Sequence, residues 1–176
     1  MPGSGKGVVS EIAQSLGFLV VRMGDVIRDE TTSRGLDPTP TNIGKIMLQL
    51  REEEGAAVVA ERCVEKVGTV MTQLLLIDGI RSLDEVKVFS KKFTNFTLLA
   101  IFASLETRFA RLFKRMRSDD GANHREFMER DSRELQVGIG SAMAIADYAL
   151  INEGDLESFK MEVKRFLQKM IVDEWS

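Results

Sequence analysis

Four short apolar runs, rich in Val, Leu, Ile and Phe, alternate with longer amphipathic stretches along the chain. Apolar runs of this length are typical of strands buried in a parallel sheet. They predict strands at Phe18–Arg22, Leu74–Ile77, Thr97–Phe102 and Tyr148–Ile151. The amphipathic stretches predict helices at Val8–Leu16, Val58–Val67, Leu83–Lys91, Glu106–Met116 and Leu156–Met170. Strands that alternate with helices in this way predict an α/β fold with a parallel sheet.

Local signals mark where several helices begin. Thr39 before Pro40 is typical of an N-cap and a first helical position, and Ser82-Leu83-Asp84-Glu85 fits a capping box. Asp155 precedes the last predicted helix and is expected to cap it. Two segments, at about residues 25–55 and about 117–138, stand outside the regular alternation. We expect a single domain over residues 1–176, in which these segments form mobile covers over a site.

The composition is that of a globular domain of ordinary size. Of 176 residues, 44% are hydrophobic, and 24 Lys and Arg against 27 Asp and Glu give a net charge of −3. This balance argues against a polybasic nucleic-acid-binding protein, and no apolar run is long enough to cross a membrane. The only cysteine, Cys63, and the only histidine, His124, cannot form an intramolecular disulfide or a usual His/Cys metal site. We expect a cytoplasmic protein, monomeric or homodimeric, that binds neither nucleic acid nor membrane.

A glycine-rich segment at the start of the chain carries the strongest functional signal. Gly3-Ser4-Gly5-Lys6-Gly7 runs directly into the helical stretch that begins at Val8. Glycines let successive backbone N–H groups curl around phosphate oxygens, a helix N-terminus adds a partial positive charge, and Lys6 supplies a full one. The segment therefore predicts the end of a P-loop that binds the phosphates of ATP. The residues expected to contact the nucleotide here are Gly3, Ser4, Gly5, Lys6, Gly7 and Val8.

The segment departs from the full P-loop pattern in two respects. The pattern G-x-x-x-x-G-K-[ST] places its first glycine five positions before Gly5, upstream of Met1, and the strand that usually precedes the loop is also missing. We expect residues upstream of Met1 to supply both. In addition, Gly7 stands where most P-loop proteins have the Ser or Thr that binds magnesium.

Charged residues follow two of the predicted strands, at the edge of a parallel sheet where ligands bind. Asp78 ends the second apolar run and is placed to accept metal-bound water beside the P-loop, so we expect Mg²⁺ to be held through water near it. Asp25 and Arg28 follow the first run, and Arg81 follows Asp78. Guanidinium groups suit phosphate, so Arg28 and Arg81 are candidate substrate-binding residues.

Further arginines lie in or near the segment at about residues 117–138. Arg108, Arg111 and Arg115 lie opposite an apolar face of one predicted helix, and we assign Arg108 to the solvated surface. A lid that closes can bring cations onto a transferred phosphoryl group. The arginines that we retain as candidates for such contacts are Arg111, Arg115, Arg117, Arg130 and Arg133.

Several of these motifs resemble those of known nucleotide kinases. Pro2–Gly7 is similar to the P-loop of adenylate kinase and its relatives, which tolerate glycine after the lysine. Met23–Arg28 resembles the Gly-Asp-x-x-Arg segment that opens the acceptor-binding helices of nucleoside monophosphate kinases, and Leu76–Arg81 resembles their Asp-Gly-Phe-Pro-Arg segment without the proline. Residues 115–120 resemble the arginine and paired-aspartate lid of these kinases, through Arg115, Arg117, Asp119 and Asp120.

The C-terminal part resembles a second kinase. Residues 146–154 are similar to the last strand and purine loop of dephospho-coenzyme A kinase, which assigns Asn152 to the cofactor site. Almost the whole chain is covered, and it most resembles an archaeal family of P-loop kinases, of unassigned substrate, related to adenylate kinase. The resemblance implies a three-layer P-loop NTPase fold with strand order 2-3-1-4-5, strand 1 lying upstream of Met1.

The resemblance also implies a reaction, in which the γ-phosphoryl group of ATP passes to a small acceptor with Mg²⁺ as cofactor. A nucleoside monophosphate acceptor needs no general base, since its phosphate is largely ionised, and Asp25 and Arg28 would position it. A ribose hydroxyl acceptor needs a base, for which Asp25 is the candidate. A third alternative is a nucleotide-binding module with little catalysis. The residues assigned to catalysis are Lys6, Asp25, Asp78, Arg115 and Arg117, and those assigned to the acceptor are Asp25, Arg28, Arg81, Arg130 and Arg133.

Overall fold

The structure, a computed structural model, describes residues 1–68, 74–115 and 124–174. Its strands are β1 (Leu19–Arg22), β2 (Leu75–Asp78), β3 (Leu99–Phe102) and β4 (Tyr148–Ile151). Its helices are α1 (Lys6–Ser15), α2 (Met23–Ser33), α3 (Pro40–Glu54), α4 (Val58–Val67), α5 (Leu83–Lys92), α6 (Leu105–Arg115), α7 (His124–Val137), α8 (Ile139–Ala144) and α9 (Leu156–Glu174). The predicted strands and helices are confirmed to within a few residues at their ends, and the α/β class is confirmed with them.

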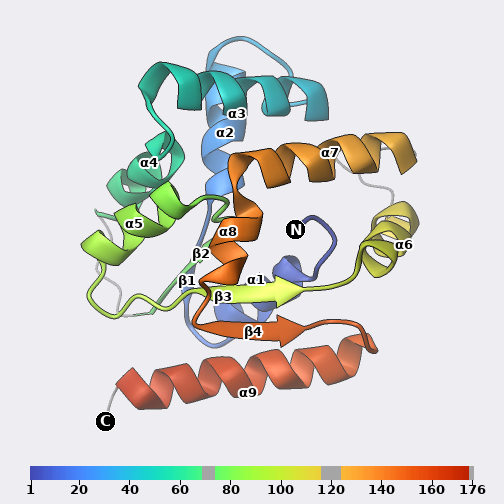
Figure 1. Cartoon of the computed structure of the whole chain (residues 1–176). Helices are drawn as coiled ribbons and strands as arrows, with labels where there is room; N and C mark the ends of the chain where they lie inside the picture. Colours follow the sequence, from blue (N-terminus) through green and yellow to red (C-terminus); the bar gives the residue numbers. More distant parts are fainter. Residues whose placement is uncertain (69–73, 116–123, 175–176) are drawn as a thin grey trace.

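The described strands form two parallel pairs (Figure 1). β1 pairs with β2, Leu19 lying opposite Leu75, and β3 pairs with β4, Leu99 lying opposite Tyr148. The two pairs are not hydrogen-bonded to each other. A cavity of about 950 Å³ lies between them and is lined by the whole of β2, by much of β3 and by apolar residues of α8 and α9.

Two main apolar clusters cover the two strand pairs. One cluster joins α1 to α9 and includes Ile101 of β3 and Leu150 of β4. The other gathers buried residues of α2, α3, α4 and α5, with Val21 of β1 and Ile77 of β2 packed against it. Burial of this apolar area is the main favourable term in folding. The carboxyl end of β1 leads directly into α2, and that of β3 leads to α6 (Figure 1).

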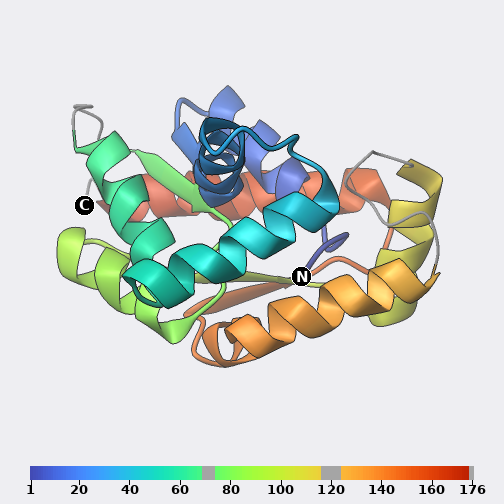
Figure 2. The same ribbon diagram turned by 90° about the horizontal axis from the view of Figure 1, so that it is seen from above.

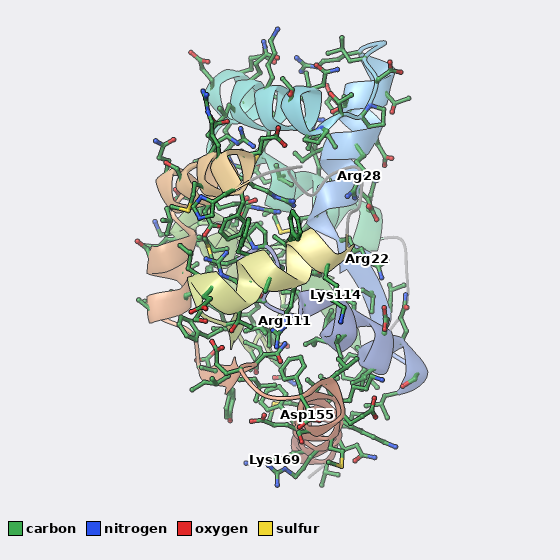
Figure 3. The ribbon with its side chains drawn as sticks, turned by 90° about the vertical axis from the view of Figure 1, so that its right-hand side faces the viewer. Arg22, Arg28, Arg111, Lys114, Asp155 and Lys169 are labelled. Atoms are coloured by element: carbon green, nitrogen blue, oxygen red, sulfur yellow. The ribbon has the colours of Figure 1, made fainter. Side chains whose placement is uncertain are left out.

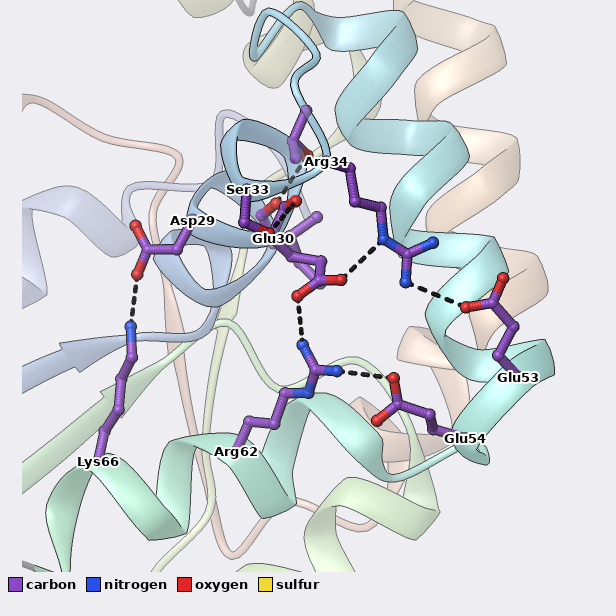
Figure 4. Close-up of polar contacts among 10 residues, drawn as sticks. Asp29, Glu30, Ser33, Arg34, Glu53, Glu54, Arg62 and Lys66 are labelled. Atoms are coloured by element: carbon purple, nitrogen blue, oxygen red, sulfur yellow. Dashed lines mark hydrogen bonds and ion pairs between the residues drawn. The ribbon is translucent and has the colours of Figure 1, made fainter.

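The three helices between β1 and β2 are tied together by charged side chains. Glu30 of α2 accepts hydrogen bonds from Arg34 and from Arg62 of α4, each 2.7 Å long. The same two arginines reach Glu53 and Glu54 at the end of α3 (Figure 4). These pairs lie at the surface, where each contributes little stability. They do, however, link α2, α3 and α4 to one another.

The predicted helix caps have the expected geometry. The Thr39 side chain accepts a hydrogen bond from Asn42 N at the start of α3, and the Ser82 side chain does the same for Glu85 N at the start of α5. Asp155 accepts from Ser158 N at the start of α9. The second half of the capping box is different, because the Glu85 carboxylate accepts from the backbone N–H of Arg81 and not of Ser82.

Candidate functional site

The glycine-rich segment forms a tight loop that ends in α1. Gly3 has φ 79° and Gly5, the residue before the helix, has φ 109°, conformations that favour glycine. Lys6 begins the helix, and its Nζ donates to the carbonyl oxygen of Met1 at 3.0 Å. Ser4 is fully buried, and its Oγ has no hydrogen-bond partner among the described residues. A curled loop of amides at a helix N-terminus, with a lysine at its mouth, is the geometry of a phosphate site.

The loop is held from behind by the end of β4. The Asn152 side chain is buried, donates from Nδ2 to Ser4 O at 2.9 Å and accepts at Oδ1 from Arg111 of α6 at 3.1 Å. Arg111 also donates to the carbonyl oxygen of Asn152 at 3.0 Å. The structure therefore brings Arg111 and Asn152 to the loop, where their described contacts shape the loop itself. Val8 likewise turns its side chain to the apolar cluster of α1 and α9.

This packing makes Gly5 and Gly7 a matched pair for a test. A Cβ at Gly5 would overlap Asn152 Nδ2 and touch Phe159, whereas a Cβ at Gly7 would meet nothing within 4 Å. We expect Gly5→Ala to lower the free energy of unfolding by about 2–4 kcal/mol, because strain from positive φ adds to overpacking. Gly7→Ala should be neutral or slightly stabilising. Thermal and urea denaturation measure both, and equal stability of the two variants would contradict this packing.

The end of β2 lies against the loop. Asp78, the last residue of β2, accepts a hydrogen bond from Ser10 of α1, and the Asp78 charge acts on Lys6. Arg81 folds back over the turn and donates from Nη1 to Gly79 O at 2.7 Å. Lys6, Asp78 and Arg81, predicted from separate motifs, therefore lie in one place.

An unexpected acid lies among these cations. Glu134 of α7 is buried and accepts a hydrogen bond from Arg81 Nε. Burial opposes its ionisation, but the charges of Arg81, Arg130 and Lys6 outweigh burial and hold the pKa of Glu134 below its usual value. Burial lowers the pKa of Lys6, which the negative charges of Asp78 and Glu134 partly oppose. The site is thus a cluster of half-buried cations balanced by two carboxylates, of which Glu134 is buried.

A second buried pair fixes α7 to α6. Arg108 donates to both carboxylate oxygens of Asp131, at 2.8 and 2.5 Å, and also to the carbonyl oxygen of Pro2 at 3.2 Å. The Phe127 ring lies 5.3 Å from the guanidinium carbon. The assignment of Arg108 to the solvated surface is therefore wrong, because Arg108 is only 5% exposed. Its charge is stable there because Asp131 pairs with it and carbonyl oxygens take its other donors.

The other predicted acceptor residues lie around the opening of the site. Arg28 Nη1 donates to Asp25 Oδ1 at 2.8 Å in the first turn of α2, and both side chains are about half exposed. Figure 3 shows this side of the molecule, with Arg22 and Arg28 near the start of α2 and Arg111 and Lys114 on α6. The guanidinium of Arg133 lies against Gly44, so that α7 runs beside α3 (Figure 2).

Some predicted residues lie outside the described part of the chain. These are Arg117, Asp119 and Asp120, together with the side chain of Arg115, the last residue of α6. Among the described residues, no group of three or more His, Cys, Asp or Glu side chains could hold a metal ion. Mg²⁺ usually keeps several waters and needs only one or two carboxylates beside the substrate phosphates, so Asp78 fits a magnesium site of this kind. Burial raises the pKa of Cys63 to about 11, as expected for a core residue and not for a nucleophile.

Sequence reasoning missed Ser10, Glu85, Asp131 and Glu134. Glu85 is fully buried and binds Arg51 Nη2 at 2.6 Å as well as the Arg81 N–H, which fixes the turn that carries Arg81. Each acid resembles a surface residue of an amphipathic helix in the sequence. The helical spacing of Phe127, Asp131 and Glu134 was the one available signal, since it places the two acids on the face of a core aromatic residue.

The amino-acid sequence of the chain is similar to those of several known proteins. The UPF0200 protein of Methanothermobacter thermautotrophicus is 50% identical over 170 residues, which cover 97% of this chain and 87% of the relative. The chain belongs to the UPF0200 family. The UPF0200 proteins of Hyperthermus butylicus and Thermococcus kodakarensis are 46% and 42% identical, over 91% and 95% of their own lengths.

A family model described as an AAA domain matches residues 1–126. The match includes the glycine-rich loop, β1, β2 and β3, so this UPF0200 protein has a P-loop nucleotide-binding domain with an α/β fold. Among the described residues, none of the helices is both long and apolar enough to span a membrane.

Proposed function

We propose that this UPF0200 protein is an ATP-dependent small-molecule kinase, related to adenylate kinase and dephospho-coenzyme A kinase, that phosphorylates a nucleoside monophosphate-like acceptor. The observation that carries the proposal is the convergence of the charges of Lys6, Arg81 and Arg130, from three separate elements, around the buried Glu134 and beside Asp78. Phosphoryl transfer needs positioning and charge stabilisation more than covalent chemistry. Half-buried cations near the end of a parallel strand supply both.

On the donor side, the loop amides from Gly3 to Gly7 and the Lys6 ammonium would bind the phosphates of ATP. Mg²⁺, when bound, would neutralise phosphate charge, and Asp78 would hold its water. Ser10 orients the Asp78 carboxylate by donating a hydrogen bond to it. The Arg111–Asn152 contact keeps the loop curled, and the lid arginines Arg115 and Arg117 are proposed to contact the transferred group.

On the acceptor side, the helices of residues 25–55 would form the wall of the acceptor site. Asp25 lies in the first turn of α2, directly after β1, and Arg28 follows in the second turn, while Arg133 reaches from α7 to α3. Arg81 and Arg130 lie deeper, beside Lys6. We propose that residues 117–138, which include the whole of α7, act as the lid over both substrates.

We further propose that an additional parallel strand fills the cavity between β2 and β3, which completes a sheet of order 2-3-1-4-5 within a three-layer fold. Three features support this: both neighbouring pairs are parallel, the cavity is lined along β2 and β3, and Met1 itself lines it. We propose that residues preceding Met1 supply this strand. Its backbone would pair with the free edges of β2 and β3 and carry the first glycine of the P-loop.

The function is tested by multiple-turnover phosphoryl transfer from ATP to a panel of nucleoside monophosphates and of nucleosides and coenzyme precursors with free hydroxyls. The 176-residue chain and a chain extended at its N-terminus are compared. We expect phosphorylation of one monophosphate acceptor, faster in the extended chain. ATP binding without transfer to any acceptor would instead support a nucleotide-binding module.

The variant Asp25→Asn separates the two kinase alternatives, because it preserves size but removes a basic oxygen. With a monophosphate acceptor, we expect a modest loss that appears mainly in KM, since Asp25 then only positions Arg28 and the acceptor. With a hydroxyl acceptor, general-base assistance is worth about 10²- to 10⁴-fold in kcat. A collapse of kcat at saturating acceptor with unchanged KM would favour phosphorylation of a hydroxyl.

A further inference from the structure

Helix α7 is attached to the rest of the protein through a charged face. Its buried residues are Phe127, Asp131 and Glu134, whose spacing places them on one side of the helix. Buried carboxylates are stable when a cation pairs with each of them. Arg108 pairs with Asp131, and Arg81 pairs with Glu134. The helix is therefore held by two ion pairs, beside the contacts of His124 and Phe127 with the Phe109 ring.

The two ion pairs differ in how fully the arginine is used. Arg108 donates from Nε to Ala103 O, and its Nη atoms bind Asp131 and Pro2 O, so all three nitrogens are occupied. Arg81 donates from Nε to Glu134 and from Nη1 to Gly79 O, while its Nη2 makes no hydrogen bond to any described residue. Arg81 can thus donate a hydrogen bond to a further anion through Nη2. Arg108 cannot, because all three of its nitrogens already have partners.

Glu134 lies among cations that could also bind a phosphate group. The groups whose charges act on it are Arg81, Arg130 and Lys6, and Lys6 belongs to the P-loop. A carboxylate offers these cations one negative charge and two oxygens. A phosphate monoester offers nearly two charges and three strongly accepting oxygens at neutral pH. A phosphate group that enters the site is therefore the stronger partner for Arg81.

We propose that Glu134 is a positioning residue that competes with the acceptor's phosphate for Arg81 and so selects phosphate monoester dianions as acceptors. This inference rests on the proposed kinase function and names its acceptor class. Glu134 holds the Arg81 guanidinium beside Lys6 until a dianion displaces the carboxylate. A neutral hydroxyl acceptor lacks the charge to displace it, and Arg81 then stays paired with α7.

The test measures binding of inorganic phosphate, AMP and uncharged adenosine by titration calorimetry. Glu134→Gln keeps the size and hydrogen bonding of the side chain but removes its charge, so phosphate and AMP should bind about tenfold more tightly, as expected for loss of a charged competitor. Adenosine binding should not change. Glu134→Asp, which keeps the charge, should retain the weaker affinity of the wild type.

The matched control is Glu129→Gln, which makes the same change on an exposed position of α7 that pairs only with Arg125 among the described residues. It should bind all three ligands as the wild type does. Unchanged or weaker phosphate binding in folded Glu134→Gln would overturn the proposal, because a purely structural role of Glu134 predicts no gain in affinity.

A second measurement uses the wild type and does not depend on how the variants fold. The ¹⁵N–¹H resonance of Arg81 Nε, assigned by its loss in Arg81→Lys, should move when inorganic phosphate is added, and a resonance that stays in place at saturation contradicts the proposal. ATP titration of the wild type is the separate test of the proposed function. If the wild type binds ATP and transfers its phosphoryl group, but Glu134→Gln does not bind phosphate more tightly, then the proposed role of Glu134 is contradicted and the proposed kinase function is not.

Discussion

Replacing Lys6 with alanine should abolish turnover while the protein stays folded. Lys6 is the first residue of α1 and the cation closest to the loop amides, and hydrogen bonds to charged groups contribute about 1.5–3 kcal/mol. We therefore expect ATP to bind about 10- to 100-fold more weakly, with a further loss in turnover on the order of 10²-fold from lost charge stabilisation of the transition state. Calorimetry and a coupled phosphoryl-transfer assay measure the two effects.

Stability should change little in Lys6→Ala, because the substitution removes a charge whose burial already lowers its pKa. The control is Lys169→Ala, at an exposed position on α9 far from the loop (Figure 3). This variant should bind and use ATP as the wild type does. ATP affinity and turnover in Lys6→Ala equal to those of the control would refute the P-loop assignment of this segment.

Replacing Asp131 with alanine should cause the largest loss of stability among the charged residues of α7. The substitution leaves the Arg108 guanidinium buried without its partner, and such a break costs about 3–5 kcal/mol. For a domain of this size, the melting temperature should fall by about 6–20 °C. Urea denaturation and calorimetry measure the change. Because Arg108 also holds the carbonyl of Pro2, we expect the P-loop to loosen and ATP binding to weaken with it.

Glu129→Ala provides the comparison, because its ion pair with Arg125 lies on the exposed side of the same helix. Exposed pairs contribute about 0–1 kcal/mol, so this variant should unfold close to the wild type. The double variant Arg108→Met with Asp131→Leu should recover much of the lost stability, since it removes both buried charges. If Asp131→Ala and Glu129→Ala were equally stable, the burial of the Arg108–Asp131 pair would be wrong.

The sequence was sufficient to predict the strands, most helices and their caps. Each of these depends on residues close together in the chain: the run at Leu74–Ile77, the Thr39–Pro40 start of α3, and the capping side chain of Asp155. The parallel pairing of β1 with β2 also followed from local pattern, because apolar runs separated by helices pair in parallel. The P-loop, with Gly3 and Gly5 at positive φ, belongs to the same group.

The structure brings several of the predicted site residues together. Lys6, Asp78 and Arg81 lie together because each follows a strand or opens a helix at the same edge of the fold, a relation that the motifs already contain. Arg111 and Asn152 reach the loop as well, although their hydrogen bonds to each other and to Ser4 O could not be predicted from their positions in the sequence.

What only the tertiary structure decided is which charges are buried. By sequence, Arg108 has the pattern of a solvent-facing position on an amphipathic helix, and only their spacing from Phe127 distinguishes Asp131 and Glu134 from exposed acids such as Glu129. A charge leaves water only where a distant partner compensates its lost hydration, and those partners lie 23 residues away for Arg108 and 53 for Arg81. The periodicity of apolar residues indicates which face of a helix packs against the core. Whether a charged side chain can be buried depends instead on a partner of opposite charge from elsewhere in the fold.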